Sequence, residues 1–94
     1  MSPSFEWDGL KARENVRKHR VNFDEASSVL SDPLSITNSD TRHSADERRH
    51  IDIGMSALGR VLVVVYTERG STIRIISART ATKAERTRYE EATA

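Results

Sequence analysis

Cysteine is absent from this 94-residue sequence, and long apolar runs are absent as well. Without thiols the chain forms no disulfide scaffold, no thiolate nucleophile and no cysteine-ligated zinc site. The longest apolar run, residues 61–66, is far shorter than the roughly 20 residues that span a bilayer. The N-terminus, MSPSFEWDG, has neither the cationic nor the apolar segment of a secretory signal. We therefore expect a cytoplasmic protein that does not enter a membrane.

Glycine, histidine and aromatic residues are also scarce. The four glycines are scattered singly, which excludes a phosphate-binding glycine loop, and no nucleophile elbow marks a serine. Because His19, His43 and His50 lack metal-ligand spacing, we expect no metal and no cofactor. The five aromatic residues form no series for stacking bases, and helix-turn-helix spacing is missing. At this length, residues 1–94 are expected to form a single domain.

Three segments begin with helix-start signals. Asp8 is expected to cap a helix that ends near residue 19. Asn22 is expected to cap a second helix that ends at the Asp-Pro pair 32–33, and Thr82 a third that ends near residue 91. A glutamate three residues after each of these last two caps predicts a capping box or a variant of it. The first and third helices have few apolar residues, so we expect both to be largely exposed and candidates for partner contacts.

The rest of the chain alternates between apolar and polar residues as strands do. This alternation predicts strands at 5–7, 34–37, 47–55, 60–67 and 72–77, with a loop at 38–46 and turns at 56–59 and 68–71. We expect residues 49, 51, 53 and 55 to share one face, and the run 61–66 to be buried on both faces. The sequence thus predicts an α+β fold: a small antiparallel sheet with two N-terminal helices and one C-terminal helix, the helices gathered on one face.

The formal net charge of +1 argues at first against a nucleic-acid-binding protein. The two halves of the chain differ, however. Residues 1–46 hold six basic and eight acidic residues, whereas residues 47–94 hold nine basic and six acidic ones. Eight of those nine basic residues are arginines, whose planar guanidinium groups bind phosphate through two hydrogen bonds. The second half is therefore the better candidate for binding a phosphate group, unless its arginines only lie on solvent-exposed faces.

The cationic residues of the second half suggest a site for a phosphodiester. Arg74 stands alone between isoleucines on a predicted strand, and Arg79 follows directly after that strand, where loops place functional groups. Such arginines can stabilise charge that develops on phosphate oxygens, although Arg74 could instead simply pair with a carboxylate. The neighbouring cationic or aromatic candidates are Arg48, Lys83, Arg86 and Tyr89. Cleavage of RNA also needs a base for the 2′-hydroxyl and an acid for the leaving 5′-oxygen, for which the candidates are Lys18, His19, Glu47 and Tyr89.

Several short blocks follow one another in a distinctive order. They are FEWD (5–8), NVRKHRVNFDEA (15–26), DP (32–33), ERR (47–49), IG (53–54), LVVVYTERG (62–70), IRIISAR (73–79) and ATKAERTRYE (81–90). In order and spacing they resemble the BrnT toxin family of bacterial type II toxin–antitoxin systems. The resemblance implies a RelE-like ribonuclease that cuts RNA without metal and arrests growth. It also implies a BrnA-like antitoxin partner, often as two toxins with two antitoxins, and contact with operator DNA only through that antitoxin.

Carried over by position, the resemblance implies a set of functional residues without settling which is acid and which is base. The catalytic candidates are Lys18, His19, Glu47, Arg74 and Arg79, and the RNA-binding candidates are Arg48, Lys83, Arg86 and Tyr89. Arg20 departs from the family pattern, which has a glycine after Lys-His at the end of the first helix. The alternative interpretation is a non-catalytic binding module, or a degenerate toxin that only binds RNA or the antitoxin.

Overall fold

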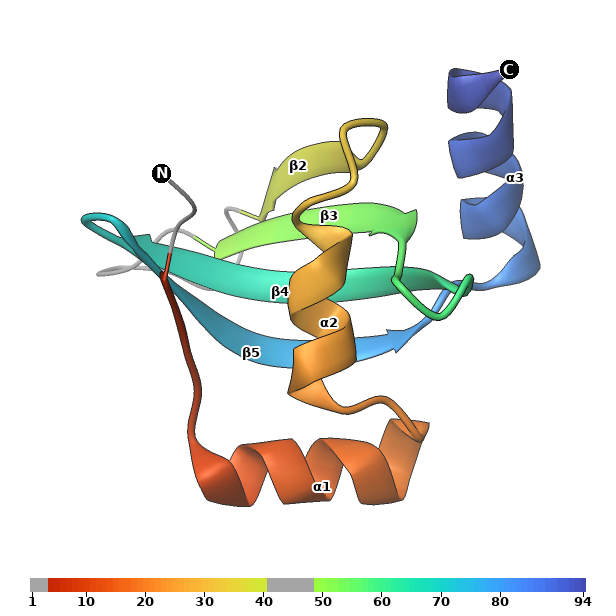
Figure 1. Ribbon diagram of the computed structural model, residues 1–94. Coiled ribbons are helices and arrows are strands. Elements are labelled where there is room, and N and C mark those ends of the chain that lie inside the picture. The colour runs from red at the N-terminus through yellow and green to blue at the C-terminus, as the bar shows by residue number, and fades with distance from the viewer. Residues whose placement is uncertain (1–3, 41–48) are drawn as a thin grey trace.

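The fold is built on one five-stranded sheet (Figure 1), seen in a computed structural model that describes residues 4–40 and 49–94. Its strands are β1 (Ser4–Glu6), β2 (Ile36–Asp40), β3 (Arg49–Met55), β4 (Val61–Arg69) and β5 (Thr72–Thr80). In space they are ordered β1-β5-β4-β3-β2. All neighbours are antiparallel except β1, which runs parallel to β5. The α+β prediction is confirmed, but the expectation of a purely antiparallel sheet is wrong.

Three helices join this sheet, and each begins at the predicted cap. In α1 (Gly9–His19), the Asp8 carboxylate accepts hydrogen bonds from the backbone N–H groups of the first turn. In α2 (Phe23–Val29), the Asn22 side chain accepts from the Glu25 N–H, but the Glu25 carboxylate bonds to Arg60 and Ser56 and does not complete a capping box. In α3 (Lys83–Thr93), the reciprocal capping box is present. Sequence signals that act within one turn therefore predicted the starts of the helices.

The helices lie on both sides of the sheet rather than on one, which corrects the prediction. Helices α1 and α2 cover the face that carries Leu62, Val64 and Ile75, where most of the buried core lies. Helix α3 packs at one end of the opposite face, where Tyr89 joins Ile53 and Val63 in a second, smaller cluster. The reason is that β4 is apolar on both faces, so each face needs cover. Within the described ranges, no helix is long and apolar enough to cross a membrane.

Two strands extend further than the sequence predicts. Strand β2 includes residues 38–40, which were expected to lie in a loop, because they pair with β3. Strand β5 continues to Thr80, which pairs with Leu62 at the start of β4. Arg79 is therefore a strand residue and not part of a following loop. A register shift in the β4–β5 pairing leaves Ile76 without an opposite residue, so Arg74 and Arg79 both reach the face opposite α1 and α2.

Candidate active site on the open face of the sheet

Among the described residues, α3 covers one end of the face of the sheet opposite α1 and α2, which we call the open face. Residues directly opposite each other on paired strands point to the same face, so they form rows across the sheet. Three such rows cross β3, β4 and β5: Ile53–Val63–Arg79, Ile51–Val65–Ser77 and Arg49–Thr67–Arg74. The middle of the open face is thus apolar, with an arginine on β5 to either side of it.

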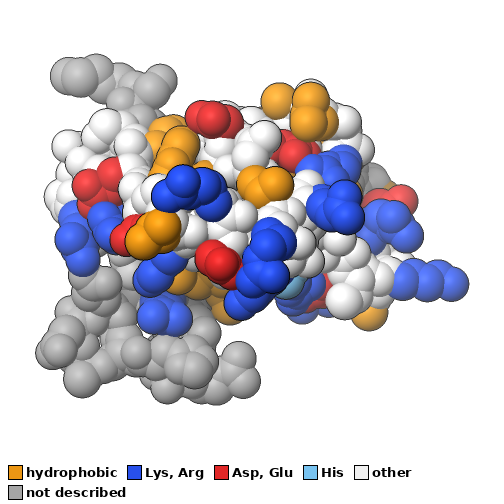
Figure 2. Space-filling model, turned by 90° about the horizontal axis from the view of Figure 1, so that it is seen from below, with side chains coloured by type: hydrophobic (Ala, Val, Ile, Leu, Met, Phe, Trp, Pro, Cys, Tyr) orange, Lys and Arg blue, Asp and Glu red, His pale blue; other side chains and the backbone are white. Residues whose placement is uncertain are grey.

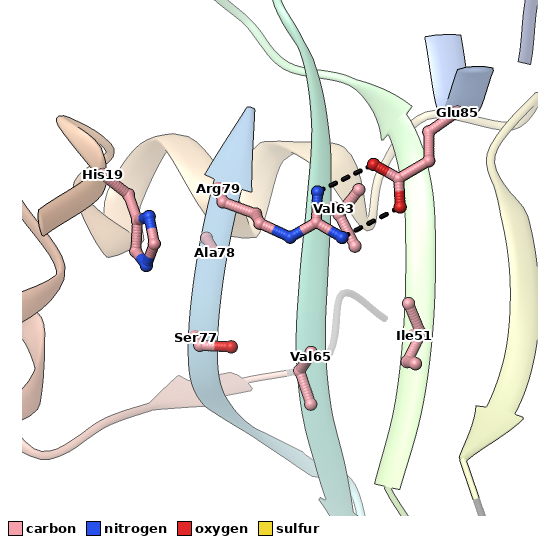
Figure 3. Close-up of a pocket in the computed structure, with 8 residues that line it drawn as sticks. All are labelled: His19, Ile51, Val63, Val65, Ser77, Ala78, Arg79 and Glu85. Atoms are coloured by element: carbon pink, nitrogen blue, oxygen red, sulfur yellow. Dashed lines mark hydrogen bonds and ion pairs between the residues drawn. The ribbon is translucent and has the colours of Figure 1, made fainter. Parts of the chain in front are cut away.

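A pocket of about 500 Å³ occupies the part of the open face next to α3 (Figure 3). Its apolar lining comes from β3 and β4, and its polar groups come from α1, β5 and α3. The lining residues are His19, Ile51, Val63, Val65, Ser77, Ala78, Arg79 and Glu85. The pocket therefore brings together two predicted catalytic residues, His19 and Arg79, that are 60 positions apart in the chain.

His19 reaches the pocket because α1 is fixed to the edge of β5. The buried side chain of Asn15 donates from Nδ2 to the Ala78 carbonyl (2.7 Å) and to the Val21 carbonyl (2.9 Å), and its Oδ1 accepts from the Ala78 N–H (3.1 Å). This amide supplies the hydrogen bonds that a neighbouring strand would otherwise make with Ala78. His19 follows Asn15 by four residues, so it lies on the same side of α1, one turn further on. The imidazole consequently lies beyond the edge of β5 and lines the pocket together with Ser77 and Arg79 (Figure 3).

Arg79 is held across the pocket by Glu85 of α3 (Figure 3). Its two terminal nitrogens donate to the two carboxylate oxygens, at 2.7 and 2.9 Å. The hydrogen bonds from Arg79, with further help from the Thr82 backbone N–H, lower the pKa of Glu85 to about 2, and the same pair raises the pKa of Arg79. Both groups are therefore charged at neutral pH. A carboxylate with so low a pKa is a poor base, so Glu85 orients Arg79 and does not accept a proton from substrate.

The remaining cationic candidates lie around this pocket but do not line it. Arg74 lies in the row at the other end of the open face and forms a 3.5 Å ion pair with Glu6, so the alternative of carboxylate pairing is observed for it. Lys18 is exposed and directly precedes His19 at the end of α1. Lys83 is exposed at the start of α3, and Arg86 lines a different hollow beside Val61. Glu47 and Arg48 lie outside the described residues.

Tyr89 does not suit its predicted role in RNA binding. The side chain is buried in the small cluster under α3, with only 5% of its surface exposed. Its hydroxyl donates a 2.6 Å hydrogen bond to Asp32 Oδ2. Burial and this bond raise the pKa of Tyr89 to about 12, which also removes it as an acid or base near neutral pH. We correct the prediction: Tyr89 attaches α3 to the sheet.

Sequence reasoning missed four residues that shape the open face. They are Asn15, Arg49, Ser77 and Glu85. The spacing of Asn15 and His19 was a usable signal for a shared helix side, but nothing local showed that this side meets the edge of β5. In the same way, Glu85 was expected only as a cap, and its second bond to Arg79 depends on where α3 packs. Within residues 4–40 and 49–94, no group of three His, Asp or Glu side chains could hold a metal ion.

Comparisons with known proteins agree with this architecture. A family model described as "Ribonuclease toxin, BrnT, of type II toxin-antitoxin system" matches residues 7–85. The 1.1 Å crystal structure of the ribonuclease toxin BrnT of Brucella abortus matches with a TM-score of 0.66 and 25% sequence identity, over 87% of this chain and 100% of that chain. A search of curated proteins found no match. The class is thus a toxin of a type II toxin–antitoxin system. More narrowly, the chain belongs to the BrnT family of ribonuclease toxins.

Proposed function

We propose that this chain is a metal-independent, RelE-like endoribonuclease and that the pocket on the open face holds the scissile phosphodiester. The observation that carries the proposal is the convergence of His19, Ser77 and Arg79 on one accessible hollow with an apolar floor. The floor suits a ribose or base, and the polar wall suits the phosphate. Ile51, Val65 and Ser77 are partly exposed on this face, where a single strand of RNA would lie.

Arg79 binds a non-bridging phosphate oxygen in this proposal. Two of its five N–H groups are bonded to Glu85, and a third points to the Thr80 carbonyl at 3.3 Å. The Nε–H and one N–H of the terminal group are left for an anionic oxygen. Because Glu85 fixes the guanidinium before substrate arrives, the positive charge is in place as negative charge grows on the phosphorane.

His19 transfers a proton in the same step. The ribose 2′-oxygen attacks the adjacent phosphorus, the bond from phosphorus to the 5′-oxygen breaks, and a 2′,3′-cyclic phosphate remains. The 2′-hydroxyl proton must leave and the 5′-oxygen must gain one, and imidazole is the side chain that does either near neutral pH. Lys18 and Arg74, both outside the pocket lining, are secondary candidates that bind neighbouring phosphates.

The partners follow from the same proposal. A type II system includes an antitoxin, and we propose that it is related to BrnA, assembles as two toxins with two antitoxins, and alone contacts operator DNA. The RNA substrate makes the cytoplasm the site of action. The exposed faces of α1 and α3 are our candidates for antitoxin contact, because both helices have few apolar residues that pack into the core.

The decisive experiment is an RNA cleavage assay in EDTA with matched variants. We expect wild type to cut RNA, and Arg79→Ala and His19→Ala to lose roughly 10²–10³-fold in rate while remaining folded by circular dichroism. Arg79→Lys keeps the charge but loses the paired hydrogen bonds, so it should stay well below wild type. Arg17→Ala is the control, because Arg17 is 71% exposed on α1 and pairs only with Glu14 in the described chain. Binding without cleavage by wild type would favour the non-catalytic module instead.

A further inference from the structure

The row Arg49–Thr67–Arg74 crosses the open face at the end away from α3. Arg49 and Arg74 are each directly opposite Thr67, on the two strands that flank β4. Neighbouring strands are about 4.8 Å apart, so the Cα atoms of the two arginines are separated by roughly 10 Å with the threonine between them. An arginine side chain is long enough to span half that distance, so both guanidinium groups can reach one anion above Thr67.

The hydroxyl group of Thr67 indicates that this row lacks a hydrogen-bond acceptor. Its side chain is buried, with 1% of the residue exposed, and its hydroxyl has no hydrogen-bond partner in the described part of the chain. It is the one such buried side-chain group among the described residues. Buried hydroxyl groups are normally hydrogen-bonded, so an orphaned one between two arginines points to a missing acceptor.

The two charges next to the threonine along the row are both positive, which favours an anion as that acceptor. An acidic residue lies one strand further out on each side, Asp40 opposite Arg49 and Glu6 opposite Arg74. Arg49 has no ion pair with any described carboxylate. Arg74 pairs with Glu6 at 3.5 Å, a loose and partly exposed contact, and its charge adds to the backbone hydrogen bonds that lower the pKa of Asp8. That pair orients Arg74 but leaves most of its N–H donors unused.

We propose that Arg49, Thr67 and Arg74 form a second phosphate subsite for the RNA strand. The inference deepens the proposed function and rests on it. Val63, in the row of Arg79, and Thr67 are four positions apart on β4, which is about 13 Å along the strand. The row Ile51–Val65–Ser77 lies between them, and its two apolar side chains offer a surface for the intervening nucleotide. The open face then binds a strand through two of its phosphates rather than one.

The test compares two substrates that differ in their number of phosphates. One is a dinucleoside monophosphate, which has only the scissile phosphate, and the other is an unstructured oligoribonucleotide. We expect Arg49→Ala to raise KM for the oligonucleotide about tenfold, with a much smaller change in kcat. On the dinucleoside monophosphate, Arg49→Ala should raise KM much less. Thr67→Val should raise the same KM several-fold without lowering the melting temperature, because valine has the same shape and removes an unbonded hydroxyl.

Binding measured without cleavage keeps this inference separate from the proposed function. In a His19→Ala background, anisotropy of labelled RNA should show weaker binding for Arg49→Ala, and a salt slope shallower by about 0.7, as expected for one lost contact to single-stranded RNA. Arg17→Ala is the control, because it also removes one arginine but lies outside the proposed subsite. The subsite would be overturned if Arg49→Ala and Arg17→Ala weakened RNA binding equally, or if Arg49→Ala raised KM equally for both substrates. Absence of cleavage by wild type would contradict the proposed function but leave this binding result intact.

Discussion

Arg20 ends α1 in a backbone conformation that suits glycine better than arginine. Its φ of 58° and ψ of 33° are left-handed, and its N–H bonds to the Val16 carbonyl. A side chain in this region costs about 1 kcal/mol. The resemblance to the BrnT family predicted this turn, since the family has glycine there.

We expect Arg20→Gly to raise the free energy of unfolding by about 0.5–1 kcal/mol, because relief of strain exceeds the added freedom of the unfolded chain. The Arg60 guanidinium donates only to the backbone carbonyl of residue 20, so this bond would persist. Thermal denaturation at neutral pH measures the change, which corresponds to several degrees in a domain of this size. Arg13→Gly, in the middle of α1, is the control and should destabilise. A lower melting temperature for Arg20→Gly would show that the turn is not strained.

At the scale of elements, the join between α1 and β5 depends on one buried amide. Asn15→Ala would leave the Ala78 N–H and carbonyl without the partners described above, so we expect a loss of roughly 2–4 kcal/mol in stability. Amide exchange at Ala78 should accelerate, and cleavage should fall because His19 is no longer held beside the pocket. Asn15→Asp keeps the acceptor but turns a carboxylate oxygen towards the Val21 and Ala78 carbonyls, so it should destabilise at least as much at neutral pH. Unchanged protection at Ala78, compared with Asn38→Ala on β2 as a control, would refute this role.

The start of α3 should give a measurable acid dependence. Glu85 has its pKa lowered from 4.5 to about 2 in the fold, so the folded state favours the carboxylate. Its stabilisation is complete above about pH 4.5 and is lost as the pH falls towards 2. Since the partner Arg79 is 42% exposed, we expect only roughly 1–2 kcal/mol from this source.

Urea denaturation of wild type and Glu85→Gln between pH 7 and pH 2 tests this dependence. Glu25 and Asp32 also have lowered pKa values, so the difference between the two proteins, and not the total slope, reports on Glu85. Wild type should be the more stable protein at pH 7, and the gap should close with acidification. Glu91→Gln removes a carboxylate from the far end of α3 and should track wild type. A gap that stays constant with pH would contradict the ion-pair explanation.

The elements also show what sequence could and could not predict. Caps such as Asp8 and Thr82 act within one turn, so they are visible locally, and so is the alternation of residues 49–55. The parallel pairing of β1 with β5 and the extension of β5 to Thr80 depend on partners far along the chain. The same limit applies to the site: His19 and Arg79 were identified as candidates by chemistry and resemblance. Their convergence, and the burial of Tyr89, required the packing of α1 and α3 on the sheet.

At the scale of the whole molecule, charge is not divided as the two halves of the sequence suggest. Helix α1 belongs to the acidic first half, yet its Lys11, Arg13, Arg17 and Lys18 are exposed. Lys and Arg side chains are spread among acidic and apolar ones over the face that Figure 2 shows. Arg74 and Arg79 from the second half are both paired with carboxylates, Glu6 and Glu85. The net charge of +1 is therefore a sum over several small basic areas, each with acidic neighbours.

This distribution predicts how RNA affinity depends on salt. If binding uses only the open face, about two or three phosphates are neutralised, and log affinity should fall with log salt at a slope of about −2 for a single strand. If RNA instead spreads over α1 as well, six or more contacts would give a slope of about −4 or steeper. Titrating labelled RNA into the non-cleaving His19→Ala protein over a range of sodium chloride concentrations separates the two cases. On the open-face route, Arg79→Ala should flatten the slope and the doubly substituted Arg13→Ala, Arg17→Ala protein should not, whereas the reverse would place the RNA on α1.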